Sequence, residues 1–214
     1  MKTLKLVIIL SLFPLISFSQ DAASKKIKEG GKFELGMRTT ISGFGSTNNV
    51  GTGFGGQFRI RLGKRLNTEW YADYITENIE GLARRNDYHI GWSVMIHPFN
   101  ATEKLLNPYV IVGHCFDNTK VSSIDNGMLD YIPQSESRLS AATQLGIGTN
   151  INVSDKFDIT LTSQYMVHLG NDVHADILEE GREVYIEKET GGNLALEGHL
   201  LFTISVNYKI FNLW

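Results

Sequence analysis

The chain has 214 residues and a formal net charge of −3, with 20 basic and 23 acidic side chains. This slightly acidic balance argues against a nucleic-acid-binding protein, and the single cysteine excludes an intrachain disulfide. The length corresponds to one domain.

The N-terminus has the pattern of a secretory signal. Lys2 and Lys5 precede an apolar run that is too short to cross a membrane comfortably as a helix. Ser17 and Ser19 then supply the small side chains that precede a cleavage site. We therefore predict a signal peptide over residues 1–19 that is cleaved near Ser19.

The rest of the chain is expected to form a short periplasmic segment, residues 20–31, and one folded domain, residues 32–214. Apolar and polar side chains alternate along eight segments of this domain. The segments are 32–43, 52–63, 66–77, 85–97, 108–116, 138–153, 156–169 and 196–211. A period of two predicts strands, and each segment is long enough for a tilted membrane-spanning strand of about 9–11 residues.

The expected connections differ in length. Tight turns are predicted at residues 64–65 and 154–155, and longer loops at 78–84, 117–137 and 170–195. Short turns at one end and long loops at the other are typical of outer-membrane barrels. The chain after the signal contains no apolar segment long enough for a membrane helix, so strands that cross a membrane would have to close into a barrel.

The alternation alone does not say whether the apolar face of each strand points outward or into the lumen, and the two cases correspond to two kinds of barrel. In the last segment Phe202, Ile204 and Val206 alternate with Thr203 and Ser205. The apolar set could face lipid, or it could line the lumen of a soluble lipocalin-like ligand carrier. Small residues on the polar face favour the first sense, because a narrow lumen has little space; they are Gly36, Gly55, Gly91, Gly146 and Gly148. We predict an all-β fold, an eight-stranded antiparallel up-and-down transmembrane β-barrel.

Aromatic residues are expected to form two belts at the levels of the lipid headgroups. The periplasmic belt would contain Phe33, Trp70, Tyr109, Phe157 and Tyr208. The outer belt would contain Phe54, Tyr74 and Tyr88.

The polar faces supply a set of charged side chains for the lumen. These are Glu34, Arg38, Arg59, Arg61, Glu69, Asp73, Asp87 and His89. If the turn at 64–65 sets an even register, Arg61 lies opposite Glu69 and Gln57 lies opposite Asp73. Buried charges must be paired, and an eight-stranded barrel is just wide enough for side chains to fill. The prediction is a filled polar lumen, with a narrow gated pore as the alternative.

The chain resembles the small outer-membrane β-barrel families of the OmpA-transmembrane-domain and OmpX type, particularly those of Bacteroidetes. The resemblance rests on the eight-segment pattern and on the last residues, where Tyr208, Ile210 and Trp214 look like the signal read by the barrel-assembly machinery. It implies a bacterial outer membrane location, with lipids and lipopolysaccharide around the wall. No cofactor is implied.

Three kinds of chemistry compete with this structural role. His168 and His199, with Glu197 close by, could hold a transition metal near the outer end of the lumen. His114 and Cys115 are adjacent in a strand and point to opposite faces, which argues against an activated nucleophile. Some small barrels act on lipid A, but the His-x-Ser-Asn pattern of the deacylases does not occur in the chain, and a non-enzymatic role is expected.

The last long connection is acidic, and it alternates over residues 183–187. This predicts a hairpin that extends beyond the membrane. Its exposed edge could bind an extracellular partner by strand addition, or the acidic side chains could share bridging divalent cations.

Overall fold

The computed structural model describes residues 30–44, 50–100, 104–125, 132–170, 173–177, 184–188 and 198–214. The expected signal peptide and most of segment 20–31 lie outside these residues. The described strands are β1 (Lys32–Phe44), β2 (Val50–Arg61), β3 (Leu66–Ile79), β4 (Ala83–Ile96), β5 (Leu106–Ser123), β6 (Ser135–Asn152), β7 (Phe157–Leu169), β8 (Val173–Ile177), β9 (Val184–Lys188) and β10 (Gly198–Asn212).

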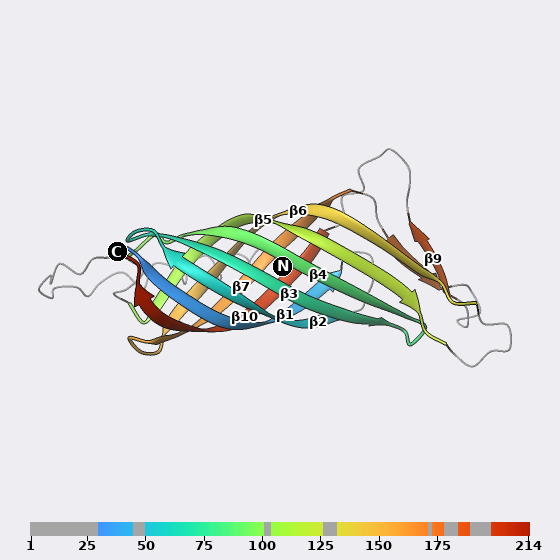
Figure 1. Cartoon of the computed structure of the whole chain (residues 1–214), viewed down its shortest axis with the longest axis horizontal. Helices are drawn as coiled ribbons and strands as arrows, with labels where there is room; N and C mark the ends of the chain where they lie inside the picture. Colours follow the sequence, from blue (N-terminus) through green and yellow to red (C-terminus); the bar gives the residue numbers. More distant parts are fainter. Residues whose placement is uncertain are drawn as a thin grey trace, which may run out of the picture.

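Eight of these strands close into one antiparallel barrel in the order β1-β10-β7-β6-β5-β4-β3-β2 (Figure 1). Closure joins the first strand to the last, with Lys32 opposite Asn212 and Thr40 opposite Thr203. The amide of Leu213 also donates to the carbonyl of Gly31 at 2.7 Å. Closure leaves no free strand edge in the barrel. The predicted fold class is confirmed.

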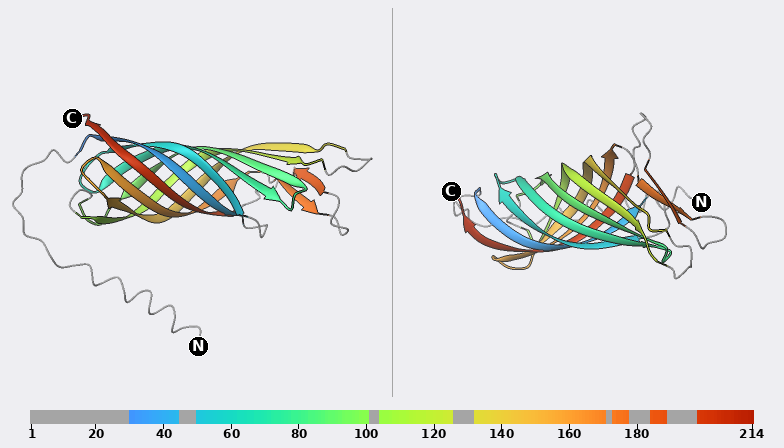
Figure 2. Two further views of the ribbon diagram at one scale, coloured as in Figure 1. Left: turned by 90° about the horizontal axis from the view of Figure 1, so that it is seen from below. Right: turned by 45° about the vertical axis from the view of Figure 1, so that its right-hand side comes forward.

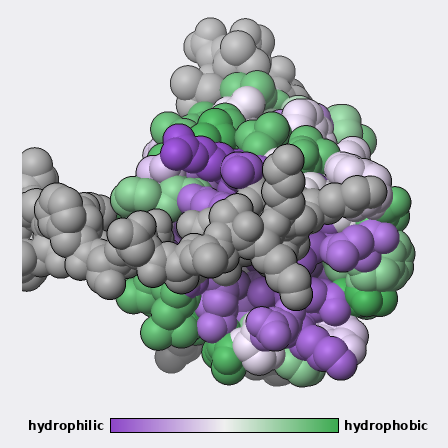
Figure 3. Space-filling model, turned by 90° about the vertical axis from the view of Figure 1, so that its left-hand side faces the viewer, coloured by the Kyte–Doolittle hydropathy of each residue, from purple (hydrophilic) through white to green (hydrophobic). Residues whose placement is uncertain are grey.

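The two faces of the barrel wall differ sharply in polarity. Trp92, Leu161 and Ile204 are exposed on the outward face, whereas the inward neighbours Ser93, Thr160 and Ser205 are buried. Figure 3, a view onto one end, shows hydrophilic residues in the centre and hydrophobic residues around the rim. The apolar set therefore faces outward, as predicted. Among the described residues no helix is long and apolar enough to cross a membrane.

The register of β2 and β3 differs from the expected one by two residues. Arg59, not Arg61, lies opposite Glu69, and Arg61 lies opposite Asn67. Gln57 lies opposite Tyr71, and Asp73 opposite Gly55. The prediction was wrong because the amide of Leu62 bonds to the carbonyl of Leu66, which centres the turn one residue earlier.

Two predicted loops are shorter than expected. β5 continues to Ser123 and β6 begins at Ser135, so only 124–134 connects them. β3 and β4 are joined by a tight turn at 80–82, where Gly81 adopts a φ of 77° and its amide bonds to Asn78 Oδ1 at 2.7 Å. The loops were overestimated because outward side chains such as Lys120 become polar there, and the apolar alternation ends before the strands do.

One expected member of the aromatic belt is absent from it. Tyr109 is 2% exposed and points into the lumen, where its hydroxyl lies 2.6 Å from Thr162 Oγ1. Trp70, another expected member, stacks on the wall between two further aromatic residues: its ring centroid is 5.9 Å from that of Phe58 and 6.2 Å from that of Trp92.

The strands β8 and β9 form a separate two-stranded hairpin in the connection from β7 to β10. We call the end of the barrel that carries this hairpin the outer end, and the opposite end, with the C-terminus, the inner end (Figures 1 and 2). A small apolar cluster packs the hairpin against the extensions of β3, β4 and β5. Its buried members are Ile79, Ala83, Val121, Val173 and Ile186.

Candidate functional site

All eight charged residues expected in the lumen are buried there, but they divide into two groups. Six lie toward the inner end, and with Asp158 and Lys209 they form what we call the arginine network. Its members are Glu34, Arg38, Arg59, Arg61, Glu69, Asp73, Asp158 and Lys209. Asp87 and His89 lie toward the outer end.

The arginine network is built around Glu69. Arg59 Nη2 lies 2.5 Å from Glu69 Oε2, and Arg38 Nη1 lies 3.2 Å from Glu69 Oε1. Arg38 Nε also contacts Asp73 Oδ1 at 3.1 Å, and Arg59 Nη1 lies 3.7 Å from Asp158 Oδ1. Four carboxylates thus balance four cationic side chains, which is the condition for burying so many charges.

Hydrogen bonds carry this network across the lumen. Arg59 Nη1 of β2 donates to Thr160 Oγ1 of β7 at 2.8 Å, and Tyr71 of β3 donates to Gln144 Oε1 of β6 at 2.8 Å. Neither pair of strands is adjacent in the barrel. Side chains therefore bridge the lumen from wall to wall.

An apolar layer packs beside the arginine network toward the outer end, and Asp73 of the network lies between two of its members on β3 and opposite His89 of β4. The layer consists of Tyr71, Ile75, Cys115, Ala142, Met166 and Leu201. Cys115 is fully buried and its Sγ lies 3.7 Å from Met166 Sδ. The neighbouring His114 packs instead against Trp92 and Phe116, which are both exposed on the outward face.

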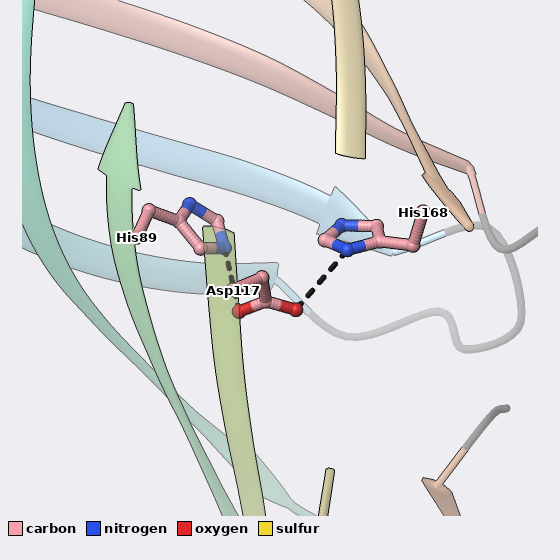
Figure 4. A group of neighbouring side chains, drawn as sticks. All are labelled: His89, Asp117 and His168. Atoms are coloured by element: carbon pink, nitrogen blue, oxygen red, sulfur yellow. Dashed lines mark ion pairs between the residues drawn. The ribbon is translucent and has the colours of Figure 1, made fainter. Parts of the chain in front are cut away.

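A histidine cluster, defined as His89, Asp117 and His168, lies beyond the apolar layer. The residues come from β4, β5 and β7, and both imidazole rings face the carboxylate between them (Figure 4). His89 Nε2 lies 3.2 Å from Asp117 Oδ1, and His168 Nδ1 lies 3.1 Å from Asp117 Oδ2. One donor atom from each residue falls within 4.8 Å of the others, so the group could hold a metal ion.

Charged neighbours surround the histidine cluster. Arg138 Nη2 lies 3.7 Å from Asp117 Oδ2, and Arg85 Nε lies 3.1 Å from Asp87 Oδ2. The hydroxyl of Thr119 lies 2.7 Å from Asp87 Oδ1 and 3.0 Å from Asp117 Oδ2. Arg85 and Arg138 therefore offset carboxylate charge at this level of the lumen, where Glu77 is also buried opposite Arg85.

The metal ligands expected from sequence are only partly brought together. The rings of His168 and His199 are neighbours, with centroids 4.5 Å apart, while Glu197 lies outside the described residues. Sequence reasoning missed Asp117, because it was assigned to a loop. His89 was assigned to the lumen, but nothing in the sequence indicated that it would meet His168.

The residues expected to form the assembly signal lie on the outward face at the inner end. Tyr208, Ile210 and Trp214 are all exposed. Tyr208 packs against Phe157 with a centroid separation of 4.9 Å.

Comparisons with known proteins agree with this architecture. Residues 9–181 match the model of the outer membrane protein beta-barrel domain family. No curated protein matches the chain. Among solved structures, a major outer membrane protein from Thermus thermophilus is similar at a TM-score of 0.57 and 11% identity, covering 83% of this chain and 99% of that one. Neisserial surface protein A is similar at a TM-score of 0.52 and 13% identity, covering 84% and 97%.

These low identities show the fold alone, whereas the family match spans most of the sequence. The chain belongs to the outer membrane protein beta-barrel domain family of the bacterial outer membrane.

Proposed function

We propose that this protein is a non-enzymatic integral protein of the outer membrane whose lumen is closed by side chains and whose outer end serves structural or binding roles. The observation that carries the proposal is the arginine network. Its links across the lumen, such as Arg59 to Thr160 and Tyr71 to Gln144, occupy the path that a solute would take.

The charge balance of the network supports a closed lumen over a narrow pore. A conducting lumen keeps charged side chains in contact with water, whereas Arg38 and Arg59 each contact two carboxylates and are nearly inaccessible to solvent. Opening the path would require several of these buried ion pairs to separate together, and each separation leaves charge uncompensated.

The outer end supports a role in binding. Among the described residues, β8 and β9 pair only with each other, so the hairpin offers backbone edges beyond the barrel. Ile186 N donates to Gln134 Oε1 at 3.0 Å, and Lys188 Nζ donates to the carbonyl of Ser137 at 2.8 Å. These two hydrogen bonds hold the hairpin on the barrel. We propose that this surface meets an extracellular partner. On the wall, the proposed partners are lipid and lipopolysaccharide, and the assembly machinery would read Tyr208, Ile210 and Trp214.

Single-channel recording in planar lipid bilayers tests the closed lumen. The folded protein should give no steady conductance steps. A variant with Arg38→Ser, Arg59→Ser, Glu69→Ser and Tyr71→Ser should conduct, because it empties the centre of the network and removes the largest side chain of the apolar layer beside it. Steady steps from the unmodified protein would overturn the proposal in favour of a pore.

Deletion of residues 172–192 tests the binding role. The barrel should still fold, as shown by heat-modifiable migration on a gel, while partner pull-down or cell adhesion should fall. Unchanged adhesion and pull-down with a folded barrel would count against a role for the hairpin.

A further inference from the structure

We propose that His89, Asp117 and His168 form a binding site for a divalent transition-metal ion of the zinc class. The site lies inside the outer end of the lumen, between the apolar layer and the hairpin. This inference does not depend on whether the lumen conducts, because none of the three residues belongs to the arginine network.

The first support is convergence from three strands. His89 Nε2, Asp117 Oδ1 or Oδ2, and His168 Nδ1 all point to one region within 4.8 Å of each other (Figure 4). All three residues are at most 1% exposed. Four zinc ligands at about 2.0–2.2 Å from the metal lie roughly 3.5 Å apart, so small rotations of the two rings would bring the donors into place.

The second support is unused hydrogen-bonding capacity. Although His89 Nε2 and Asp117 Oδ1 are only 3.2 Å apart, neither has a hydrogen-bond partner of good geometry among the described residues. The third donor atom, His168 Nδ1, lies 3.3 Å from Ser140 Oγ as well as near Asp117. Buried polar atoms normally have partners, and a bound ion is one of the explanations for those that do not.

The third support is the level of the site relative to the membrane. His89 and Asp117 are opposite each other, directly beside Tyr88 and Asn118 in the register. Tyr88 is 52% exposed and is one of the residues expected in the outer aromatic belt, and Asn118 is the first exposed polar residue after Phe116 on the outward face of β5. The site therefore lies at the outer headgroup level, where the water-exposed end of the barrel begins.

The donor set selects the class of metal. Two imidazole nitrogens and one carboxylate suit zinc and its late first-row neighbours, whereas magnesium and calcium prefer oxygen ligands alone. Three protein ligands leave one position for water or for a further ligand. The ring of His199 borders the site next to His168, and Arg138 offsets part of the charge of Asp117.

Zinc binding by the tag-free full chain, folded in detergent micelles and stripped with a chelator, tests the site. Isothermal titration with Zn²⁺ should give one ion per chain, and an excess of Mg²⁺ should not compete. Co²⁺ should bind in the same place and give visible d–d absorption that Zn²⁺ abolishes. His89→Gln, Asp117→Asn and His168→Gln should each weaken zinc binding at least about tenfold.

The matched control is His97→Gln. His97 is another buried lumen histidine, but it lies at the inner end, where its Nε2 is 3.3 Å from Asn67 Nδ2. Its substitution should leave zinc affinity unchanged. Absence of stoichiometric zinc or cobalt binding by the unmodified chain would overturn the proposal even if a variant failed to fold. Equal binding by folded His89→Gln and His168→Gln would overturn it as well.

Discussion

The inner and outer halves of the lumen differ in the side chains that neutralise their buried carboxylates. In the inner half, Arg38 and Arg59 each contact two carboxylates. In the outer half, His89 and His168 share Asp117 as their carboxylate partner. A guanidinium group stays charged and does not ligate metals, whereas a neutral imidazole does. The inner half is therefore suited to holding the wall, and the outer half to binding an ion.

The largest expected effect comes from breaking the inner half. Arg59→Met leaves Glu69 and Asp158 without their shared guanidinium group, and removal of one member of a buried ion pair typically costs about 3–5 kcal/mol. Urea unfolding of the refolded protein, followed by tryptophan fluorescence, should show this loss in the free energy of unfolding. Adding Glu69→Met should recover part of it, because the double variant restores charge balance.

The control for that variant is Arg65→Met, which changes an exposed arginine in the neighbouring turn. A surface substitution of this kind should change the free energy of unfolding by no more than about 0.5 kcal/mol. Equal losses in Arg59→Met and Arg65→Met would mean that the network does not stabilise the barrel.

Two adjacent glycines offer the next largest effect and test the packing of the inner half directly. A Cβ at Gly55 would collide with the carbonyl oxygen of Ala72 and with Asp73 Oδ1, whereas the nearest atom to a Cβ at Gly56 is Gly36 O at 3.8 Å. Gly55→Val should cost about 1–3 kcal/mol by overpacking, and Gly56→Val should be close to neutral. The same urea titration measures the free energy of unfolding of both variants. A larger loss for Gly56→Val than for Gly55→Val would mean that Gly56, not Gly55, faces the lumen.

A smaller and more local effect is expected where the hairpin covers the outer half. Ile186 is 7% exposed in the apolar cluster with Val121 and Val173, while its neighbour Tyr185 is 50% exposed. Ile186→Asp should loosen the hairpin by roughly 1–3 kcal/mol and speed trypsin cleavage after Lys188, without shifting the urea midpoint of the barrel. Tyr185→Asp should leave the cleavage rate unchanged. A shift in the barrel midpoint with Ile186→Asp would mean that the hairpin and the barrel unfold together.

The sequence allowed the inner half to be predicted further than the outer half. Strands inside the membrane alternate apolar with polar side chains, so Arg59, Glu69 and Asp73 were assigned to the lumen from parity alone. The partners of these residues depended on the centre of the turn at 62–65. Because the centre lies one residue earlier than expected, Arg59 and not Arg61 lies opposite Glu69.

Beyond the membrane the same signal disappears. Outward residues of β5 such as Asn118 and Lys120 face water, so both faces are polar and the strand resembles a loop. Asp117 was therefore placed in a loop, and its position between His89 and His168 could not be predicted. The convergence of these three residues depends on the pairing of β4 with β5 and on curvature that brings β7 across the lumen, neither of which a local pattern specifies.

The smallest expected effect concerns the apolar layer beside the arginine network. Cys115 is fully buried in this layer, so Cys115→Ala should cost only about 1 kcal/mol, close to the value for one buried methylene group. Its thiol should resist a water-soluble maleimide in the folded barrel and react fully in urea. If the layer opened widely enough for the maleimide to enter, the folded thiol would be labelled at a rate near that of the unfolded chain. Protection of Cys115 would mean that the apolar layer stays closed to solutes of this size.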